Sequence, residues 1–176
     1  YLVEVYMNTR SYDAALKSID RIAKPSAQIL EAKQKILFQL GTQSFANADF
    51  EQALKYLNQS IAIGQYNRQT KADAYYWCGE SYYRLNRMVE AARDFNAYLQ
   101  LTTQPNNEMY ALANYNLGYI AFHRKDYTQA SNYFQKYIQL EKGENTTALA
   151  DAYNRIGDCH LHVRNFEEAK HYYSQA

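Results

Sequence analysis

Small and large apolar residues recur along this chain at a fixed interval. Four glycines are separated by 38, 39 and 39 residues, namely Gly41, Gly79, Gly118 and Gly157. Twelve residues after each glycine stands an alanine, and an earlier copy keeps only the alanine, which gives the series Ala15, Ala53, Ala91, Ala130 and Ala169. A large apolar side chain precedes each alanine by three residues, and another follows it by four. Agreement at this many positions indicates an internal repeat.

The spacing predicts two antiparallel helices in each copy. The positions three before and four after the alanine share one face of a helix with it. A glycine inside a helix costs about 1 kcal/mol relative to alanine, so its recurrence needs a packing reason. We expect the partner helix to approach each glycine closely, with the small alanine as the matching surface. Short turns should join the helices near residues 8–11, 46–49, 84–87, 123–126 and 162–165.

Residue types that favour helix ends lie between the expected helix pairs. Gly64 and Gly143 follow apolar stretches, where a residue in the left-handed conformation commonly ends a helix. Thr70, Asn107 and Thr146 carry side-chain oxygens that can accept a hydrogen bond from the first turn of a helix. We therefore expect these three residues to be N-caps.

Composition supports an all-α fold and narrows the function classes. The 176 residues include only 2 Pro and 6 Gly, and valine is scarce, so helix breakers and strand formers are both few. The net charge is +1, from 19 basic and 18 acidic residues, which lacks the basic surplus of a nucleic-acid-binding protein. No apolar run approaches the roughly 18 residues of a membrane span. The two cysteines are too few for a disulfide framework.

The repeat resembles the tetratricopeptide repeat. The third copy supplies that family's aromatic, glycine, alanine and phenylalanine positions as Tyr75, Gly79, Tyr82, Ala91 and Phe95, with Cys78 before the glycine. The resemblance covers essentially the whole chain and implies an all-α, right-handed superhelical solenoid of antiparallel helix pairs. The family's usual period is about 34 residues. The extra residues here lengthen either the first helix of each unit or the connections between units.

The repeat register also gives an expected domain organisation. We expect a single array over residues 1–176, with units at 1–27, 28–66, 67–105, 106–144 and 145–176. The first unit begins inside its first helix, the last stops inside its second, and the chain starts with Tyr1 rather than Met. We therefore expect a fragment of a longer chain that can self-associate through its uncapped ends.

The resemblance implies a partner-binding groove on the first helices of the units. Its positions follow an i, i+4, i+7, i+8 spacing, which is one helix face. They are Phe38, Thr42, Phe45 and Ala46; Tyr76, Glu80, Tyr83 and Arg84; Tyr115, Tyr119, Phe122 and His123; and Asn154, Asp158, Leu161 and His162. Aromatic residues mixed with polar ones suit a bound peptide segment. The alternative for these rings, weighed evenly for Phe38, Phe45 and Tyr76, is packing between adjacent units.

Other chemistry finds little support in the sequence. The early groove positions lack the Lys, Asn and Arg with which chaperone-binding members of the family hold a carboxylate, so we expect no such clamp. Cys159-His160-Leu161-His162 is the one metal-like cluster, and His123 occupies the position equivalent to His162 one unit earlier. No further ligands lie at suitable spacing, so we expect histidines on a solvated face. There is no phosphate-binding loop or nucleophile motif. We expect no cofactor, no metal and no catalysis.

These observations favour a non-catalytic scaffold that binds a protein or peptide segment in an aromatic-rich concave groove. Two alternatives remain open: a structural or oligomerisation module of a bacterial envelope assembly, and the regulatory arm of a larger enzyme. The long period and the tyrosine-rich units are similar in texture to bacterial envelope proteins. This similarity favours the periplasmic side of the envelope, with the cytoplasm as the alternative.

Overall fold

The computed structural model describes residues 11–105 and 107–176, and within them every regular element is helical. The elements are α2 (Tyr12–Asp20), α3 (Ala27–Ala46), α4 (Phe50–Ile63), the 3₁₀ turn η1 (Gly64–Tyr66), α5 (Arg68–Arg84), α6 (Met88–Leu101), α7 (Glu108–His123), α8 (Tyr127–Leu140), α9 (Thr146–His162) and α10 (Phe166–Gln175). The predicted all-α fold of helix pairs is confirmed.

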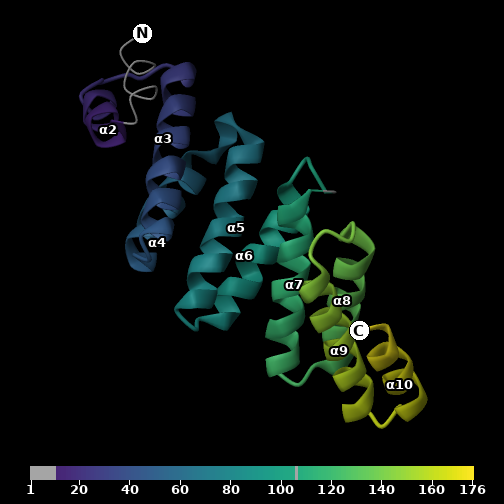
Figure 1. Cartoon of the computed structure of the whole chain (residues 1–176). Helices are drawn as coiled ribbons and strands as arrows, with labels where there is room; N and C mark the ends of the chain where they lie inside the picture. The colour runs from purple at the N-terminus through teal and green to yellow at the C-terminus, as the bar shows by residue number, and fades with distance from the viewer. Residues whose placement is uncertain (1–10, 106) are drawn as a thin grey trace. The chain divides into compact units, whose positions relative to one another are not determined.

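The helices form two compact units, one ending at Thr103 and one beginning at Gln104. In the first unit α3 pairs with α4 and α5 pairs with α6, and α5 also packs against α3 and α4 (Figure 1). In the second unit α7 pairs with α8 and α9 pairs with α10, and α9 also packs against α8. Each unit is therefore a stack of antiparallel helix pairs.

The two helices of each pair are joined by the same three-residue turn. Its middle residue adopts a positive φ, at Ala48, Asn86, Lys125 and Arg164. In the first turn the amide of Asp49 donates to the carbonyl of Ser44, and the amide of Ala48 to that of Phe45. This is the Schellman pattern of helix termination, and it recurs in the other three turns. Four predicted turns are confirmed, and the one at 8–11 lies outside the described residues except for Ser11.

The helix caps confirm some expectations and correct others. Asn107 accepts a hydrogen bond from the Tyr110 amide, as predicted for an N-cap. Thr70 and Thr146 are not caps, because an asparagine capable of the same bond precedes each of them. Asn67 accepts from the amide of Thr70 itself, and Asn145 accepts from the amide of Ala148.

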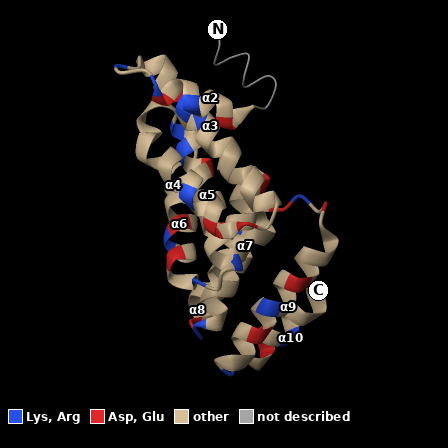
Figure 2. Cartoon of the chain, turned by 90° about the vertical axis from the view of Figure 1, so that its left-hand side faces the viewer, with Lys and Arg blue, Asp and Glu red and all other residues tan. Residues whose placement is uncertain are grey.

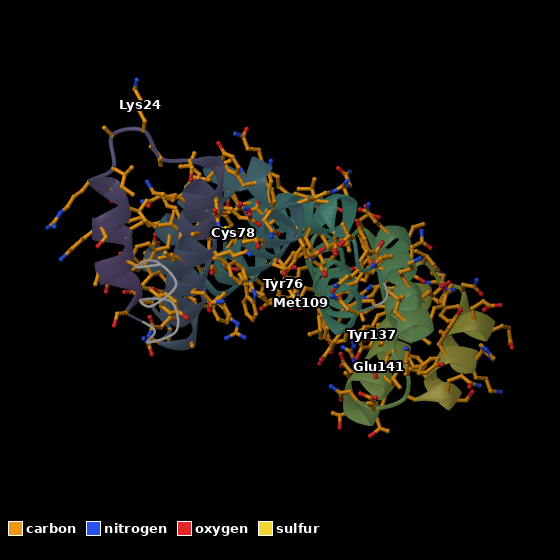
Figure 3. All side chains as sticks on the ribbon, turned by 90° about the horizontal axis from the view of Figure 1, so that it is seen from above. Lys24, Tyr76, Cys78, Met109, Tyr137 and Glu141 are labelled. Atoms are coloured by element: carbon orange, nitrogen blue, oxygen red, sulfur yellow. The ribbon has the colours of Figure 1, made fainter. Side chains whose placement is uncertain are left out.

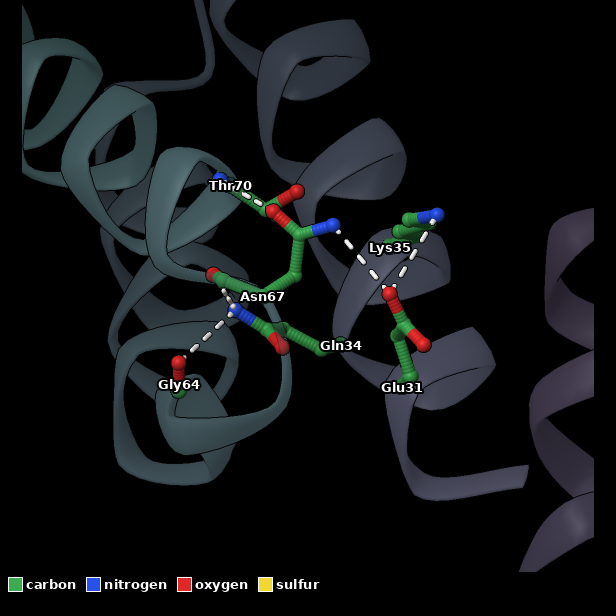
Figure 4. Close-up of polar contacts among 6 residues, drawn as sticks. All are labelled: Glu31, Gln34, Lys35, Gly64, Asn67 and Thr70. Carbon is green, nitrogen blue, oxygen red and sulfur yellow. Dashed lines mark hydrogen bonds and ion pairs between the residues drawn. The ribbon is translucent and has the colours of Figure 1, made fainter. Parts of the chain in front are cut away.

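The two glycines between helix pairs, Gly64 and Gly143, differ in backbone conformation. Gly143 has a φ of +84°, the left-handed conformation that was predicted. Gly64 does not, because α4 continues into η1 and its φ is −39°. Gln34, which is fully buried, holds this connection: its side-chain amide donates to the carbonyls of Gly64 and Asn67, at 3.4 and 2.9 Å (Figure 4).

The repeated glycines lie where the two helices of a pair touch, but their closest neighbours are not the alanines. A Cβ built on Gly118 would lie 2.8 Å from the ring of Phe134, sixteen residues later. The residue sixteen positions on is also the neighbour at the other three glycines: Leu57 for Gly41, Phe95 for Gly79 and Tyr173 for Gly157. The expected glycine–alanine contact is thus corrected to a glycine facing a large side chain. The five repeat alanines are all buried.

The first and second helices of the pairs differ in length. The first helices α3, α5, α7 and α9 are 20, 17, 16 and 17 residues long. The second helices α4, α6 and α8 have 14 residues each. The first helices are therefore longer than the second ones in the same repeats, the direction expected if a lengthened first helix takes up added residues.

Candidate partner-binding face

In the first unit the predicted groove residue Phe45 packs between helix pairs. Its ring makes edge contacts with Trp77 of α5 and Phe50 of α4, at centroid distances of 4.9 and 5.3 Å. The guanidinium carbon of Arg84 lies 5.5 Å from the centre of the same ring. Phe45 thus contributes to the contact between α3 and α5. Trp77 was not among the predicted residues, although it lies one position after Tyr76 on the same helix.

Tyr76 is a core residue rather than a surface one. It is 3% exposed, and its ring makes edge contacts with Phe95 and Tyr98 at 5.7 and 5.4 Å. Its hydroxyl donates to Glu80 at 3.1 Å. Figure 3 labels it near Cys78, which is also buried. The prediction that Tyr76 is available to a partner is therefore corrected in favour of the packing alternative.

The remaining predicted residues of the first unit are partly accessible. Phe38, Thr42 and Tyr83 are half-buried, while Ala46 is exposed. Thr42 donates to the carbonyl of Gln39 in its own helix and lines a shallow cavity with that residue. Burial raises the pKa of Tyr83, and the nearby Glu80 carboxylate adds to the rise.

In the second unit two predicted tyrosines share one carboxylate. Tyr115 and Tyr119 of α7 both donate to Oδ2 of Asp151 on α9, the former at 2.5 Å. Burial, followed by the bond to Asp151, raises the pKa of both hydroxyls, that of Tyr119 to about 12. The two rings also contact each other and Phe134. This arrangement ties α7 to α9 on the predicted groove face.

A line of charged residues on α9 continues this network. Nη1 of Arg155 pairs with Asp158 at 3.0 Å, and its Nε lies 3.8 Å from Asp151. Asp158 also accepts a hydrogen bond from Tyr173 of α10. Acidic and basic residues are interspersed on these two helices (Figure 2). Asp151 and Arg155 were missed by sequence reasoning, although their i, i+4, i+7 spacing with Asp158 marks one helix face.

An aromatic cluster that includes a histidine lies where α7 ends, α8 begins and α9 ends. His162 stacks on Tyr127 with a centroid distance of 4.3 Å, and Phe122 makes edge contacts with both rings. Arg84 and His162 occupy equivalent positions of the repeat, and each lies against an aromatic ring of the preceding helix pair: Arg84 over Phe45 and His162 on Tyr127. His123 is exposed and stacks loosely on Tyr119 at 6.1 Å. Asn154 is half-buried on α9, and Leu161 is 46% exposed.

The second unit also contains a cavity that the sequence did not reveal. Its volume is about 550 Å³, and it lies among the start of α7, the end of α8 and the connection into α9. Tyr137 and Glu141 line it, and the Tyr137 hydroxyl donates to Glu141 at 3.2 Å (Figure 3). Its other polar residues include Glu108 and Glu144, so the lining is rich in carboxylates.

The cysteine and the two histidines of the metal-like cluster at residues 159–162 have different surroundings. Cys159 is 2% exposed and belongs to the core of the second unit. His160 stacks on Tyr172, whereas His162 stacks on Tyr127. In the described part of the chain no three His, Cys, Asp or Glu side chains are grouped so as to hold a metal ion.

Both cysteine thiols are expected to resist modification in the folded protein. Burial raises the pKa of Cys159 to about 11 and that of Cys78 further. Since the thiolate is the reactive form, both should react with Ellman's reagent at pH 8 at least tenfold more slowly than in 6 M guanidinium chloride, roughly as their thiolate fractions imply. One rapidly reacting thiol without denaturant would show that its helix pair opens.

Among residues 11–105 and 107–176, none of the helices combines the length and apolar character that crossing a bilayer requires.

Stacked antiparallel helix pairs with a glycine at each pair contact define a helical-repeat protein. Two models of the tetratricopeptide repeat family match the chain, over residues 38–108 and 108–176. The chain belongs to the tetratricopeptide repeat family, whose members are typically interaction modules that bind proteins or peptides. No curated protein matches the chain.

Solved structures with the same fold are distant in sequence. MamA has a TM-score of 0.67 and 19% identity, with 99% of this chain and 91% of that protein covered. BtubC from P. vanneervenii has a TM-score of 0.72 and 14% identity, with 99% and 75% covered. The tetratricopeptide repeat protein YrrB has a TM-score of 0.65 and 16% identity, with 97% and 78% covered. These likenesses support the fold.

Proposed function

We propose that this chain is a non-catalytic scaffold that binds a peptide or protein segment on the first-helix faces of its repeats. The observation that carries the proposal is the partial exposure of aromatic and polar side chains on α3, α5, α7 and α9. Phe38, Tyr83, Tyr119 and Phe122 are all half-buried, with exposed Arg84 and His123 beside them. Partly exposed aromatic residues with polar neighbours provide contact area and fix the register of a bound segment.

The structure narrows the residues available for such contacts. Tyr76 and Phe45 contribute chiefly to packing, and Tyr119 has its hydroxyl bonded to Asp151. Tyr83 is different, because its half-buried hydroxyl has no hydrogen-bond partner in the described residues. We therefore propose Tyr83 as a principal contact residue for the segment on the first unit. Similarity to YrrB, which is described as having an unusual peptide-binding site, supports a peptide as the ligand.

Replacing Tyr83 with alanine is expected to weaken binding of the partner by about thirtyfold, because an aromatic anchor at an interface is commonly worth about 2 kcal/mol. The measurement is co-precipitation from an extract of the native organism, followed by titration of the partner recovered. The matched control is Val89→Ala, which removes a 75% exposed apolar side chain from α6. Undiminished capture by a folded Tyr83→Ala variant would place binding elsewhere.

A further inference from the structure

The cavity of the second unit has a lining of one predominant charge. Three of its residues, Glu108, Glu141 and Glu144, carry carboxylates, and Lys142 is the one cation in its described lining. Its volume of about 550 Å³ is larger than a single amino-acid side chain needs. The lining therefore carries more carboxylates than cations.

One of the three carboxylates is already used by the fold. Oε1 of Glu141 accepts from the amides of Glu144 and Asn145, at 3.2 and 3.4 Å, and Oε2 accepts from Tyr137. Glu108 and Glu144 are exposed, and neither carboxylate makes a hydrogen bond or ion pair within residues 107–176. Two acceptors at the edge of the cavity are thus available for an incoming donor.

The uncharged lining is mixed: Asn107, Asn145, Thr146 and Thr147 are polar, and the remaining residues form an apolar wall. Ala111 and Leu112 come from α7, and Leu140 and the ring of Tyr137 come from α8. Tyr115 extends this aromatic surface, with its ring centre 4.9 Å from that of Tyr137. An apolar wall below a carboxylate rim suits lysine or arginine, because their alkyl stems pack on apolar surface while the charged head meets carboxylates.

The cavity is continuous with the proposed binding face. Glu108, Leu112, Tyr115 and Tyr119 follow i, i+4, i+7, i+11 spacing, so they share one face of α7. On α9, Thr147 of the cavity precedes Asp151 by one helical turn. Oδ1 of Asp151 accepts no hydrogen bond in the described chain, and its contact with Arg155 is long at 3.8 Å. A segment lying on this face can therefore place one side chain in the cavity.

We propose that this cavity, which we call the glutamate pocket, binds a lysine or arginine side chain of the partner segment. The proposal rests on the scaffold function and specifies the chemistry of its ligand. The basic head contacts Glu108 and Glu144, and its stem packs on Leu112, Leu140 and the Tyr137 ring. Neighbouring residues of the segment lie along α7 and α9.

The test uses random twelve-residue peptides displayed on phage and selected on the wild-type protein. The selected peptides should be enriched in lysine or arginine over the unselected library. A representative peptide, labelled for fluorescence anisotropy, should bind Glu108→Gln/Glu144→Gln at least tenfold more weakly than wild type. It should bind Glu167→Gln/Glu168→Gln within twofold of wild type. That control neutralises two exposed carboxylates in the first turn of α10.

The outcomes separate this inference from the scaffold function. A peptide whose basic residue is changed to glutamine should bind the wild-type protein more weakly than the original peptide does. The Glu108→Gln/Glu144→Gln variant should bind the two peptides with nearly the same affinity. Selected peptides without basic residues whose binding depends on Tyr83 would support the scaffold function and overturn the glutamate pocket. If the pocket and control variants lost the same amount of affinity, the peptide would be held by general charge attraction, and the glutamate pocket would be overturned. Failure to select any peptide would also overturn it, while co-precipitation tests the scaffold separately.

Discussion

Replacing Gly118 with leucine is expected to lower the free energy of unfolding by about 3 kcal/mol, toward the upper end of the usual cost of overpacking. A Cβ at this position would lie 2.8 Å from Cε1 of Phe134 and 2.9 Å from two further atoms of its ring. Phe134 is fully buried and is held by edge contacts with Tyr115 and Tyr119, at 5.8 and 5.1 Å. The ring cannot move aside without disturbing the network that joins α7 to α9.

The matched control is Gly143→Asn in the connection after α8. A Cβ there meets no atom within 4 Å, and asparagine tolerates the positive φ of 84° better than most residues. Urea denaturation followed by far-UV circular dichroism should give a control midpoint close to wild type and a strongly lowered midpoint for Gly118→Leu. Equal midpoints for both variants would mean that α7 and α8 do not approach each other closely at Gly118.

The helix pairs were predictable because their signal repeats in the sequence. Each of the four copies that contain the repeat glycine has it on one helix and a large side chain on the other, and the turns fall midway between them. The sequence could not show which residue faces the glycine. The alanine and the large residue four positions later lie on the same helix face. The angle and offset between the two helices decide which one is nearer, and they favour Phe134 over Ala130 at Gly118.

The side-chain network of the candidate site was less predictable. Tyr115 and Tyr119 lie on a first helix, α7, as predicted, but their shared acceptor was not anticipated. Asp151 comes from the next helix pair, and its distance from the tyrosines depends on how α7 and α9 pack. The glutamate pocket depends similarly on the path of the connection after α8. Sequence periodicity describes each helix face, whereas contacts between pairs and loop paths require the folded structure.

Replacing Asp151 with alanine is expected to lower the free energy of unfolding by about 2 kcal/mol, because it removes the charged acceptor of two half-buried hydroxyls. The interaction can be isolated with Tyr115→Phe/Tyr119→Phe, which keeps both rings and removes both donors. In that background Asp151→Ala should cost less than about 0.5 kcal/mol, as expected when the interaction partners are already absent. A full loss in both backgrounds would show that Asp151 acts through Arg155 rather than through the tyrosines.

The same network predicts how stability depends on alkaline pH. The pKa of Tyr119 is raised to about 12 in the folded protein, mainly by burial and then by Asp151, whereas a tyrosine in the unfolded chain ionises near pH 10, roughly the model-peptide value. Its contribution to stability is therefore complete below about pH 10 and is lost as pH rises through about 12. In Asp151→Ala the pKa should fall only part of the way toward 10, since burial remains. Absorbance at 295 nm, with Tyr119→Phe to identify the ionisation, measures this shift. An unchanged titration of Tyr119 in Asp151→Ala would show that burial alone sets its pKa.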